Sequence, residues 1–471
     1  MRSSARLIIL SALVGVITGL AGWVFDEGLN LIQGVLLDRG IFLSSASPWS
    51  VVLLPAAGAG LAAWLALRWS PEALGTGSDL MVKAYQDGDG HIRRRVPFFR
   101  GLCSFLTLGS GGSAGKEGPI AQIGAGLGST LGAFFKVSGY DRRILMLAGV
   151  AGGVGAVFKA PLGGALLAAE MVGARDGFAH RAVVPGVISS VTAYSVFTSL
   201  VGHEKILCFI DPLTLGALQP AYPSREGKMF SEILHYMALS LLCAATAFLF
   251  SRIFAMCQRV STRVSTRIPA FLVPAMGGAL MGALALSTCT YVNQLHLPNF
   301  VVAAGRMPDH VMGVGHGFLQ TVVDAALDFR EYDAGTTFKL AGLLALVILV
   351  KSMGTSFTLG SGGSGGLMFP ALFLGAITGA AYSKFMRAMA ADGWLPMWLV
   401  MSPHERAGMI LVGMGGVFAA LTRAPLASLV LVSEITGSYG LVVPLMLVCA
   451  VSYLLGSGAA LAGHVKDDDD S

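Results

Sequence analysis

Charged residues are scarce in this sequence. Only 13% of the 471 residues are Asp, Glu, Lys or Arg, whereas soluble globular chains carry about 25%. The formal net charge of +5 is modest for this length and indicates no nucleic-acid partner. It fits a small excess of Lys and Arg in cytoplasmic loops of a membrane protein. No hydrophilic stretch is long enough for a separate soluble domain. The shortage of charge therefore excludes an ordinary soluble protein.

Paired cysteines are also missing. The six cysteines are scattered, mostly in apolar runs, and form no CxxC motif and no pairing with histidine. Such cysteines are typical of packing residues rather than of a metal site or a disulfide set. We therefore predict no metal and no bound cofactor. The residues are Cys103, Cys208, Cys243, Cys257, Cys289 and Cys449.

Apolar residues dominate instead. They make up 54% of the chain, and the mean hydropathy is +0.70. Runs of nearly 20 apolar residues are about long enough to cross the ~30 Å hydrocarbon core as helices. Others, such as 341–350, are shorter or broken by Gly, and the 62 Gly and 19 Pro predict helices that end inside the membrane. The composition predicts a multi-pass, all-α membrane protein. The long runs are residues 8–25, 51–67, 182–200 and 233–250.

The two ends of the chain carry little information. The first 25 residues fit either a signal peptide or a retained first helix with a cytoplasmic N-terminus, and we expect the helix because the rest is also apolar. Residues 466–471 form a short acidic tail, native or added, to which we assign no chemistry.

Internal repeats divide the chain into two halves. The segment "TLGSGGS" begins at Thr107 and again at Thr358, 251 residues apart. Three matches in one order predict a duplication. We predict a single membrane domain made of two repeats, residues 1–225 and 226–471, with broken helices at the glycine-rich motifs. The other matching pairs are residues 74–86 with 312–324, and 149–172 with 413–436.

The glycine-rich motif does not fit a nucleotide site. Residues 109–114 match the dinucleotide fingerprint, but that site needs a preceding strand, and the flanks here are apolar helices. A phosphate-binding P-loop fails because Ser110 replaces its first glycine, and Glu117 stands after Lys116 where Ser or Thr must hold magnesium.

The same backbone can bind an anion without a nucleotide. We expect a new helix to start near Glu117, where unpaired N–H groups and the helix dipole attract negative charge. Pro119 suits the first turn of that helix, and Pro370 has the equivalent place in the second copy. Two such helix ends can face one small anion and hold it loosely enough for passage.

Two charges distinguish the first copy from the second. A carboxylate near the membrane interior costs about 2.5–3.5 kcal/mol, so Glu117 is a functional candidate. When ionised it can occupy the place of the anion, and when protonated it can leave, so one residue gates the anion and carries a proton. The alternative is a glutamate that only complements the helix dipole. Lys116 is expected to raise the local anion concentration.

At these residues the sequence resembles the CLC family of chloride channels and chloride/proton antiporters, over nearly the whole chain. Residues 115–119, "GKEGP", resemble its GREGP motif, and residues 366–370, "GLMFP", are similar to its GxFxP motif. Residues 75–79, "GTGSD", resemble GSGIP with three changes. Residues 158–170 and 421–434 look like its two interfacial helices.

The resemblance implies an all-α polytopic fold of two inverted-topology repeats with broken and tilted helices. It further implies a homodimer with one pathway per subunit, in the lipid bilayer of a bacterial inner membrane. Glu117 would be the external gating glutamate. Amides of the second motif and the Thr76 hydroxyl, in place of the family's serine, would hold the central anion. The implied anion-binding residues are Thr76, Gly115, Lys116, Gly118, Gly366, Leu367 and Met368.

The chain departs from the family pattern in two places. The family's C-terminal tyrosine has no match, because its place falls near Leu461 and Tyr453 lies inside the last apolar run. Without that hydroxyl the site should bind chloride more weakly or open more to the cytoplasm. Ser78 and Asp79 replace Ile and Pro. For Asp79 we expect helix capping rather than a role in permeation.

Antiporters of this family have a second, internal glutamate, and His203-Glu204 is similar to that pattern. We expect Glu204 to relay protons, the alternative being a solvated helix end. Lys159 and Arg423 are expected to cap carbonyls or meet lipid headgroups, and His316 to be structural.

The predicted function is transport of chloride or a similar monovalent anion in exchange for protons, with fluoride, nitrate and bromide left open. A passive chloride channel of the same fold is the alternative. A membrane enzyme with Glu117 and Lys116 as an acid/base pair is disfavoured, because the second copy of the motif carries no charge.

Overall fold

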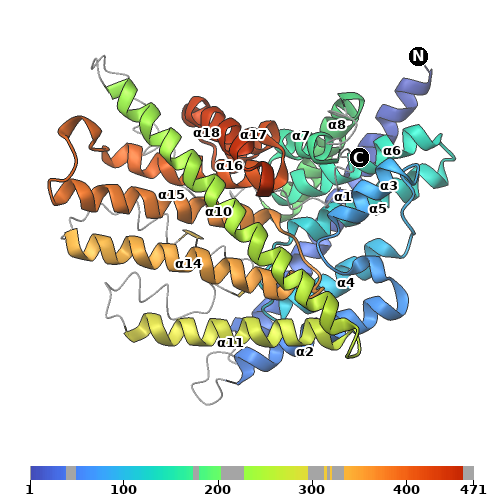
Figure 1. Cartoon of the computed structure of the whole chain (residues 1–471). Helices are drawn as coiled ribbons and strands as arrows, with labels where there is room; N and C mark the ends of the chain where they lie inside the picture. The colour runs from blue at the N-terminus through green and yellow to red at the C-terminus, as the bar shows by residue number, and fades with distance from the viewer. Residues whose placement is uncertain are drawn as a thin grey trace, which may run out of the picture.

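The computed structural model describes residues 2–38, 49–172, 180–202, 228–294, 312–313, 315, 319–320 and 334–459. Within these residues the regular structure is helical, apart from one isolated β-bridge between Gly115 and Gly366. The prediction of an all-α fold is therefore confirmed. Figure 1 shows the helices of the first half gathered on one side and those of the second half on the other, with α10 crossing the front.

The first half begins with a helix longer than its apolar run. Residues 8–25 predict one crossing, but α1 is 32 residues long and continues past Asp26 and Glu27 to Gln33. It packs against α6 and α8. The helices are α1 (Arg2–Gln33), the π-helix η1 (Gly34–Asp38), α2 (Ser50–Trp69), the 3₁₀ turn η2 (Pro71–Ala73), α3 (Ser78–Gln86), α4 (Val96–Gly109), α5 (Glu117–Phe134), α6 (Gly139–Val157), α7 (Pro161–Val172) and α8 (His180–Val201).

The second half contains one clear correction. Residues 341–350 suggest a short or broken segment, yet Gly342 lies inside a continuous helix of 27 residues, because its leucine-rich flanks are strong helix formers. The elements are α10 (Lys228–Ser265), α11 (Leu272–Gln294), α14 (Ala334–Gly360), α15 (Met368–Ala391), η4 (Met397–Leu399), α16 (Pro403–Thr422), α17 (Pro425–Thr436), η5 (Tyr439–Leu441), α18 (Val442–Leu455) and η6 (Ser457–Ala459).

Six of the described helices are long and apolar enough to cross a membrane. This agrees with the multi-pass prediction from composition, and the chain is an integral membrane protein. The six are α1, α2, α8, α10, α14 and α16.

Hydrogen bonds between the two halves are reciprocal. The Ser113 amide donates to the Thr358 hydroxyl at 3.1 Å. The amide of Ser364, its counterpart 251 residues later, donates to the Thr107 hydroxyl at 3.3 Å. Together with the antiparallel bridge, these exchanged bonds show that the two motifs run in opposite directions about one axis. The boundary at residues 225 and 226 lies outside the described residues and stays a prediction.

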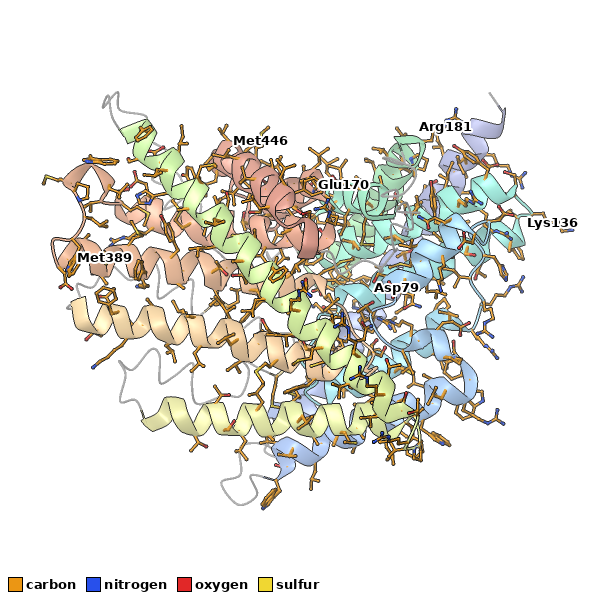
Figure 2. All side chains as sticks on the ribbon, viewed as in Figure 1. Asp79, Lys136, Glu170, Arg181, Met389 and Met446 are labelled. Carbon is orange, nitrogen blue, oxygen red and sulfur yellow. The ribbon has the colours of Figure 1, made fainter. Side chains whose placement is uncertain are left out.

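A second reciprocal pair joins α7 and α17. The Glu434 carboxylate accepts hydrogen bonds from the Leu162 and Gly163 amides at the start of α7. The Glu170 carboxylate accepts from the Leu426 and Ala427 amides at the start of α17. Each helix thus caps the other, as carboxylates at helix N-termini favourably do. Figure 2 shows Glu170 where these helices meet, away from the rim where Lys136 and Met446 lie.

Many glycines serve packing rather than helix breaking. In α5 and α6, a methyl group on Gly124 or Gly149 would overlap the backbone of the other residue. Lipid offers apolar groups no hydrophobic drive to associate, so membrane helices rely on such close backbone approach. Gly375 in α15 and Gly413 in α16 repeat the arrangement. The free thiols of Cys103, Cys243 and Cys449 are buried in this packing.

Candidate functional site

The two glycine-rich motifs meet at their ends. The Gly115 amide donates to the Gly366 carbonyl at 2.8 Å, and the Gly366 amide returns the bond to the Gly115 carbonyl at 2.8 Å. Directly after this bridge, α5 begins at Glu117 and α15 begins at Met368. Both helix starts lie where the sequence predicts them. No side-chain capping bond is made at either N-cap, and helix starts of this kind can bind an anion through their first-turn N–H groups.

A small cavity of about 50 Å³ lies beside this bridge. Thr76, Gly118, Leu367 and Met368 line it, which brings together predicted anion-binding residues from both halves. A water molecule needs about 10–15 Å³ of such space, so the cavity suits a small ion and excludes a nucleotide. Gly115, Lys116 and Gly366 are not in its lining; Gly115 and Gly366 form the adjacent bridge, and Lys116 is the N-cap of α5. The remaining lining residues are Ser78, Met81, Met171, Ala371, Leu421 and Thr422.

Glu117 stands at the first position of α5 with only 1% of its surface exposed. Its Oε2 has no hydrogen-bond partner among the described residues. A methyl group on Gly115 would collide with this carboxylate, so the side chain folds back over Gly115 toward the second motif. A buried carboxylate at a helix start competes with an anion for the same amides.

Lys116 has a partner that sequence reasoning missed. Its ammonium forms an ion pair with Asp26 of α1, 90 residues away in the chain, and the two side chains are 15% and 10% exposed. The lysine charge is thereby compensated, which weakens its predicted role in concentrating anions. Lys116 forms its ion pair with Asp26 and not with Glu117. The geometry therefore gives no support to Glu117 and Lys116 as an acid/base pair.

Arg100 holds the loop between η2 and α3, residues 74–77 (the Thr76 loop), in place. This fully buried residue of α4 donates to the carbonyls of Ala73, Gly75 and Thr76, each at 2.9 Å, and to the Gly365 carbonyl at 2.8 Å. One guanidinium therefore ties the Thr76 loop to the motif of the other half. No carboxylate pairs with it in any of the ion pairs between described residues, so its charge also favours anions nearby.

Lys351 is the counterpart of Arg100 in the second half, 251 residues later. It is also fully buried, and its Nζ donates to the Gly313 carbonyl at 3.2 Å and lies 5.3 Å from the centre of the Phe373 ring. Sequence reasoning missed both cations. Their positions in the repeat are the signal that could have found them, because each stands seven residues before its "TLGSGGS" motif.

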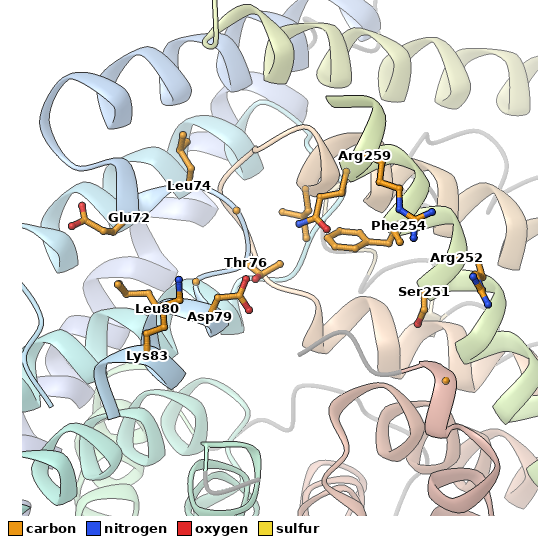
Figure 3. A pocket seen from close by; sticks show the side chains of 16 residues that line it. Glu72, Leu74, Thr76, Asp79, Leu80, Lys83, Ser251, Arg252, Phe254 and Arg259 are labelled. Carbon is orange, nitrogen blue, oxygen red and sulfur yellow. The ribbon is translucent and has the colours of Figure 1, made fainter. Parts of the chain in front are cut away.

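A wider vestibule of about 650 Å³ opens on the other side of the Thr76 loop. Thr76 lines both this space and the small cavity. Figure 3 shows the loop and α3 facing α10 across the vestibule. Its charged lining residues are Glu72, Asp79, Lys83, Arg252 and Arg259.

The capping role predicted for Asp79 is wrong. The N-cap of α3 is Gly77, whose φ of +77° suits a residue without a side chain, and no side-chain capping bond is made. Asp79 lies in the first turn with its carboxylate exposed to the vestibule. The reason is geometric, since the capping position precedes the helix by one residue and Asp79 comes two residues after it.

Other sequence predictions have mixed outcomes. Lys159 and Arg423 cap carbonyls as predicted, those of Gly202 at 3.0 Å and Tyr453 at 2.8 Å. Tyr453 lies inside α18, also as predicted, and lines neither the cavity nor the vestibule. Glu204, His316 and Leu461 lie outside the described residues, so their roles stay predictions.

The bridge predicts a strong effect for Gly366→Ala. A methyl group there would lie 2.5 Å from the Gly118 nitrogen and 2.8 Å from its Cα, and these backbone atoms cannot move aside. We expect a loss of about 1–3 kcal/mol of stability from overpacking. We also expect at least about tenfold weaker chloride binding, since about 1.4 kcal/mol at the site has that effect. Thermal unfolding of the purified protein measures the loss of stability, and calorimetric titration with chloride measures the loss of affinity.

Gly101→Ala is the matched control. Gly101 is also buried, but a methyl group there would meet only the Ile123 Cδ1 at 3.7 Å, which is ordinary contact. This variant should bind chloride as the unchanged protein does. Equal behaviour of the two variants would contradict the importance of the bridge.

Comparison with known proteins agrees with the geometry. The family model described as voltage gated chloride channel matches residues 58–457. A putative chloride channel protein, ClcB-like, of Ralstonia nicotianae is 30% identical over 459 residues, covering 95% of this chain and 93% of that protein. The H(+)/Cl(-) exchange transporter ClcA of Cronobacter sakazakii is 29% identical over 468 residues, covering 96% of this chain and 87% of that protein.

Solved structures show the same fold. A slow cyanobacterial Cl⁻/H⁺ antiporter superposes with a TM-score of 0.71 at 22% identity, covering 96% of this chain and 94% of the other. A CLC-type fluoride/proton antiporter superposes with a TM-score of 0.70 at 20% identity, covering 97% of both chains.

Proposed function

The chain belongs to the voltage-gated chloride channel family, the CLC family, and on that premise we propose that it exchanges chloride or a similar monovalent anion for protons across the membrane. One observation carries the proposal. The buried Glu117 carboxylate, whose Oε2 has no hydrogen-bond partner among the described residues, stands at one of two helix starts that the Gly115–Gly366 bridge joins beside an anion-sized cavity.

The proposed mechanism is competition for one set of amides. When Glu117 is ionised, its carboxylate accepts hydrogen bonds from the amides at the start of α5 and blocks the anion. When a proton neutralises it, that attraction disappears, the side chain leaves, and an anion takes its place. Each cycle then moves a proton with the side chain and anions through the vacated site.

The anion is held by weak, distributed charge. We assign the central site to the Leu367 and Met368 amides and the Thr76 hydroxyl, and the outer site to amides near Gly118, all beside the cavity. The buried Arg100 adds a net positive field. Sites of this kind bind strongly enough for entry and weakly enough for exit.

Several finer points belong to the proposal. We assign Glu204 as a proton relay on the side opposite Glu117, and we place the protein as a homodimer in a bacterial inner membrane. We also infer that it is no enzyme and needs no cofactor beyond the transported ions. The structurally similar proteins include a chloride/proton antiporter and a fluoride/proton antiporter, so both anions are candidates here.

A passive chloride channel is the second candidate. Its support is the lining of the small cavity, where the described residues include Thr76, Ser78 and Thr422 but no tyrosine. A weaker inner barrier would let anions pass without waiting for a proton.

A flux experiment separates the candidates. Purified protein in liposomes is given a tenfold chloride gradient at equal pH, and chloride and protons are followed with electrodes. Proton movement that is driven by the chloride gradient and builds up a pH difference supports exchange, and chloride flux alone supports the channel. Absence of any anion flux, with or without an imposed voltage, would overturn both.

A further inference from the structure

The Thr76 loop separates the small cavity from the vestibule. Ser78 lines the small cavity, Asp79 lines the wide vestibule, and Thr76 lines both spaces. The turn at Gly77, with its positive φ, lets residues this close in sequence face opposite sides. A carboxylate and two hydroxyls are thus placed in order across the loop.

The two hydroxyls are already in contact. The Thr76 Oγ1 and Ser78 Oγ lie 2.9 Å apart in a hydrogen bond. A hydroxyl can donate and accept at the same time, so this pair is a continuous link for a proton. The Thr76 carbonyl is fixed by the Arg100 guanidinium at 2.9 Å, which holds the residue in this position.

We propose that Asp79 exchanges protons with water in the vestibule and passes them through the Thr76 and Ser78 hydroxyls toward Glu117. The inference rests on the proposed exchange of anions for protons, and it assigns an entry point on the vestibule side. Figure 3 shows the Asp79 and Thr76 side chains on the same short segment, turned toward the vestibule.

The charges of the vestibule fit this assignment. Glu72, the other carboxylate in its lining, is bound by Arg93 and the Ser70 hydroxyl. Asp79 belongs to none of the ion pairs between described residues. The basic side chains of Lys83 on α3 and of Arg252 and Arg259 on α10 face the same space, so it attracts anions despite the carboxylates. No described carboxylate lines the small cavity itself.

The transfer balances at each oxygen. Protonated Asp79 gives its proton to the Thr76 oxygen, directly or through a vestibule water, as the Thr76 proton passes to Ser78. The original Ser78 proton then passes to a water in the cavity and from there to the Glu117 carboxylate. Each hydroxyl breaks one O–H bond and forms one, so both stay neutral. The net result is one proton moved from Asp79 to Glu117.

The test is the proton-to-chloride flux ratio of Asp79→Asn in liposomes. Asparagine keeps the shape but cannot carry a transferable proton, and we expect the ratio to fall at least about tenfold, in the range of lost proton-transfer groups. Asp79→Glu keeps a carboxylate that can carry a proton, so its proton-to-chloride ratio should be much closer to that of the unchanged protein than the ratio of Asp79→Asn. If Asp79 had only a structural role, the ratio would not depend on whether the side chain is an acid. Ser78→Ala, which interrupts the link, should lower the ratio as well.

Glu72→Gln is the matched control, because it removes the other vestibule carboxylate. It should leave the ratio unchanged, which separates proton exchange from a general loss of negative charge. An unchanged ratio in Asp79→Asn, or faster chloride flux at the same ratio, would overturn the assignment. If the unchanged protein moves chloride but no protons, the exchange function itself fails, and this inference fails with it.

Discussion

Glu117→Gln is expected to abolish proton movement while chloride still crosses the membrane. Glutamine imitates the protonated side chain, so it neither takes the helix-start amides as an anion does nor carries a proton. We expect proton flux to fall at least about 100-fold, as for loss of an essential acid/base group. Reconstituted liposomes with a chloride gradient and a pH electrode provide the measurement.

Glu27→Gln is the control for this experiment. Glu27 is also a glutamate of the first half, but it is exposed on α1. Its replacement should leave both fluxes as they are. Proton coupling that survives Glu117→Gln would show that this carboxylate is not the proton carrier, and the competition mechanism would have to be abandoned.

Arg100→Met should have the largest effect on stability. Methionine fills much of the space but leaves the Ala73, Gly75, Thr76 and Gly365 carbonyls without their donor. A buried acceptor left without its donor costs about 1–3 kcal/mol, and here several carbonyls lose their donor together. We expect a large drop in the unfolding temperature and chloride binding below detection.

Arg100→Lys distinguishes charge from geometry. Lysine keeps the positive charge but has three donors on one nitrogen, whereas the guanidinium reaches the loop and the second motif from two nitrogens. An intermediate loss is expected. The exposed Arg94→Met should change stability by less than about 0.5 kcal/mol. If Arg100→Met bound chloride as tightly as Arg94→Met, the clamp would not position the site.

Sequence predicted the parts of this site that depend on local backbone chemistry. Glycine-rich breaks followed by Pro119 and Pro370 located both helix starts, because such residues determine where a helix can begin. The repeat then predicted that the two starts meet. It could not predict the hydrogen-bonded bridge itself, because the chain order does not fix which backbone groups touch.

Contacts made by long side chains were not predictable in the same way. Asp26 is one acidic residue at the end of an apolar run, and only the packing of α1 brings it to Lys116. Arg100 follows two phenylalanines in a segment without any motif. The equivalence of Glu170 and Glu434 is visible in the repeat, but their exchange of caps requires α7 and α17 to be adjacent.

The bridge between Gly115 and Gly366 also has a consequence for biosynthesis. Gly115 and Gly366 are 251 residues apart in the chain. At a synthesis rate of about 5–20 residues per second, the ribosome adds them about 12–50 s apart. Until then the nascent chain lacks the helix start at Met368 that lies opposite Glu117 in the complete protein. A chain that stalls or is truncated before residue 366 has only half of the proposed anion site. The membrane therefore gains a pathway for ions only when synthesis of the site is complete.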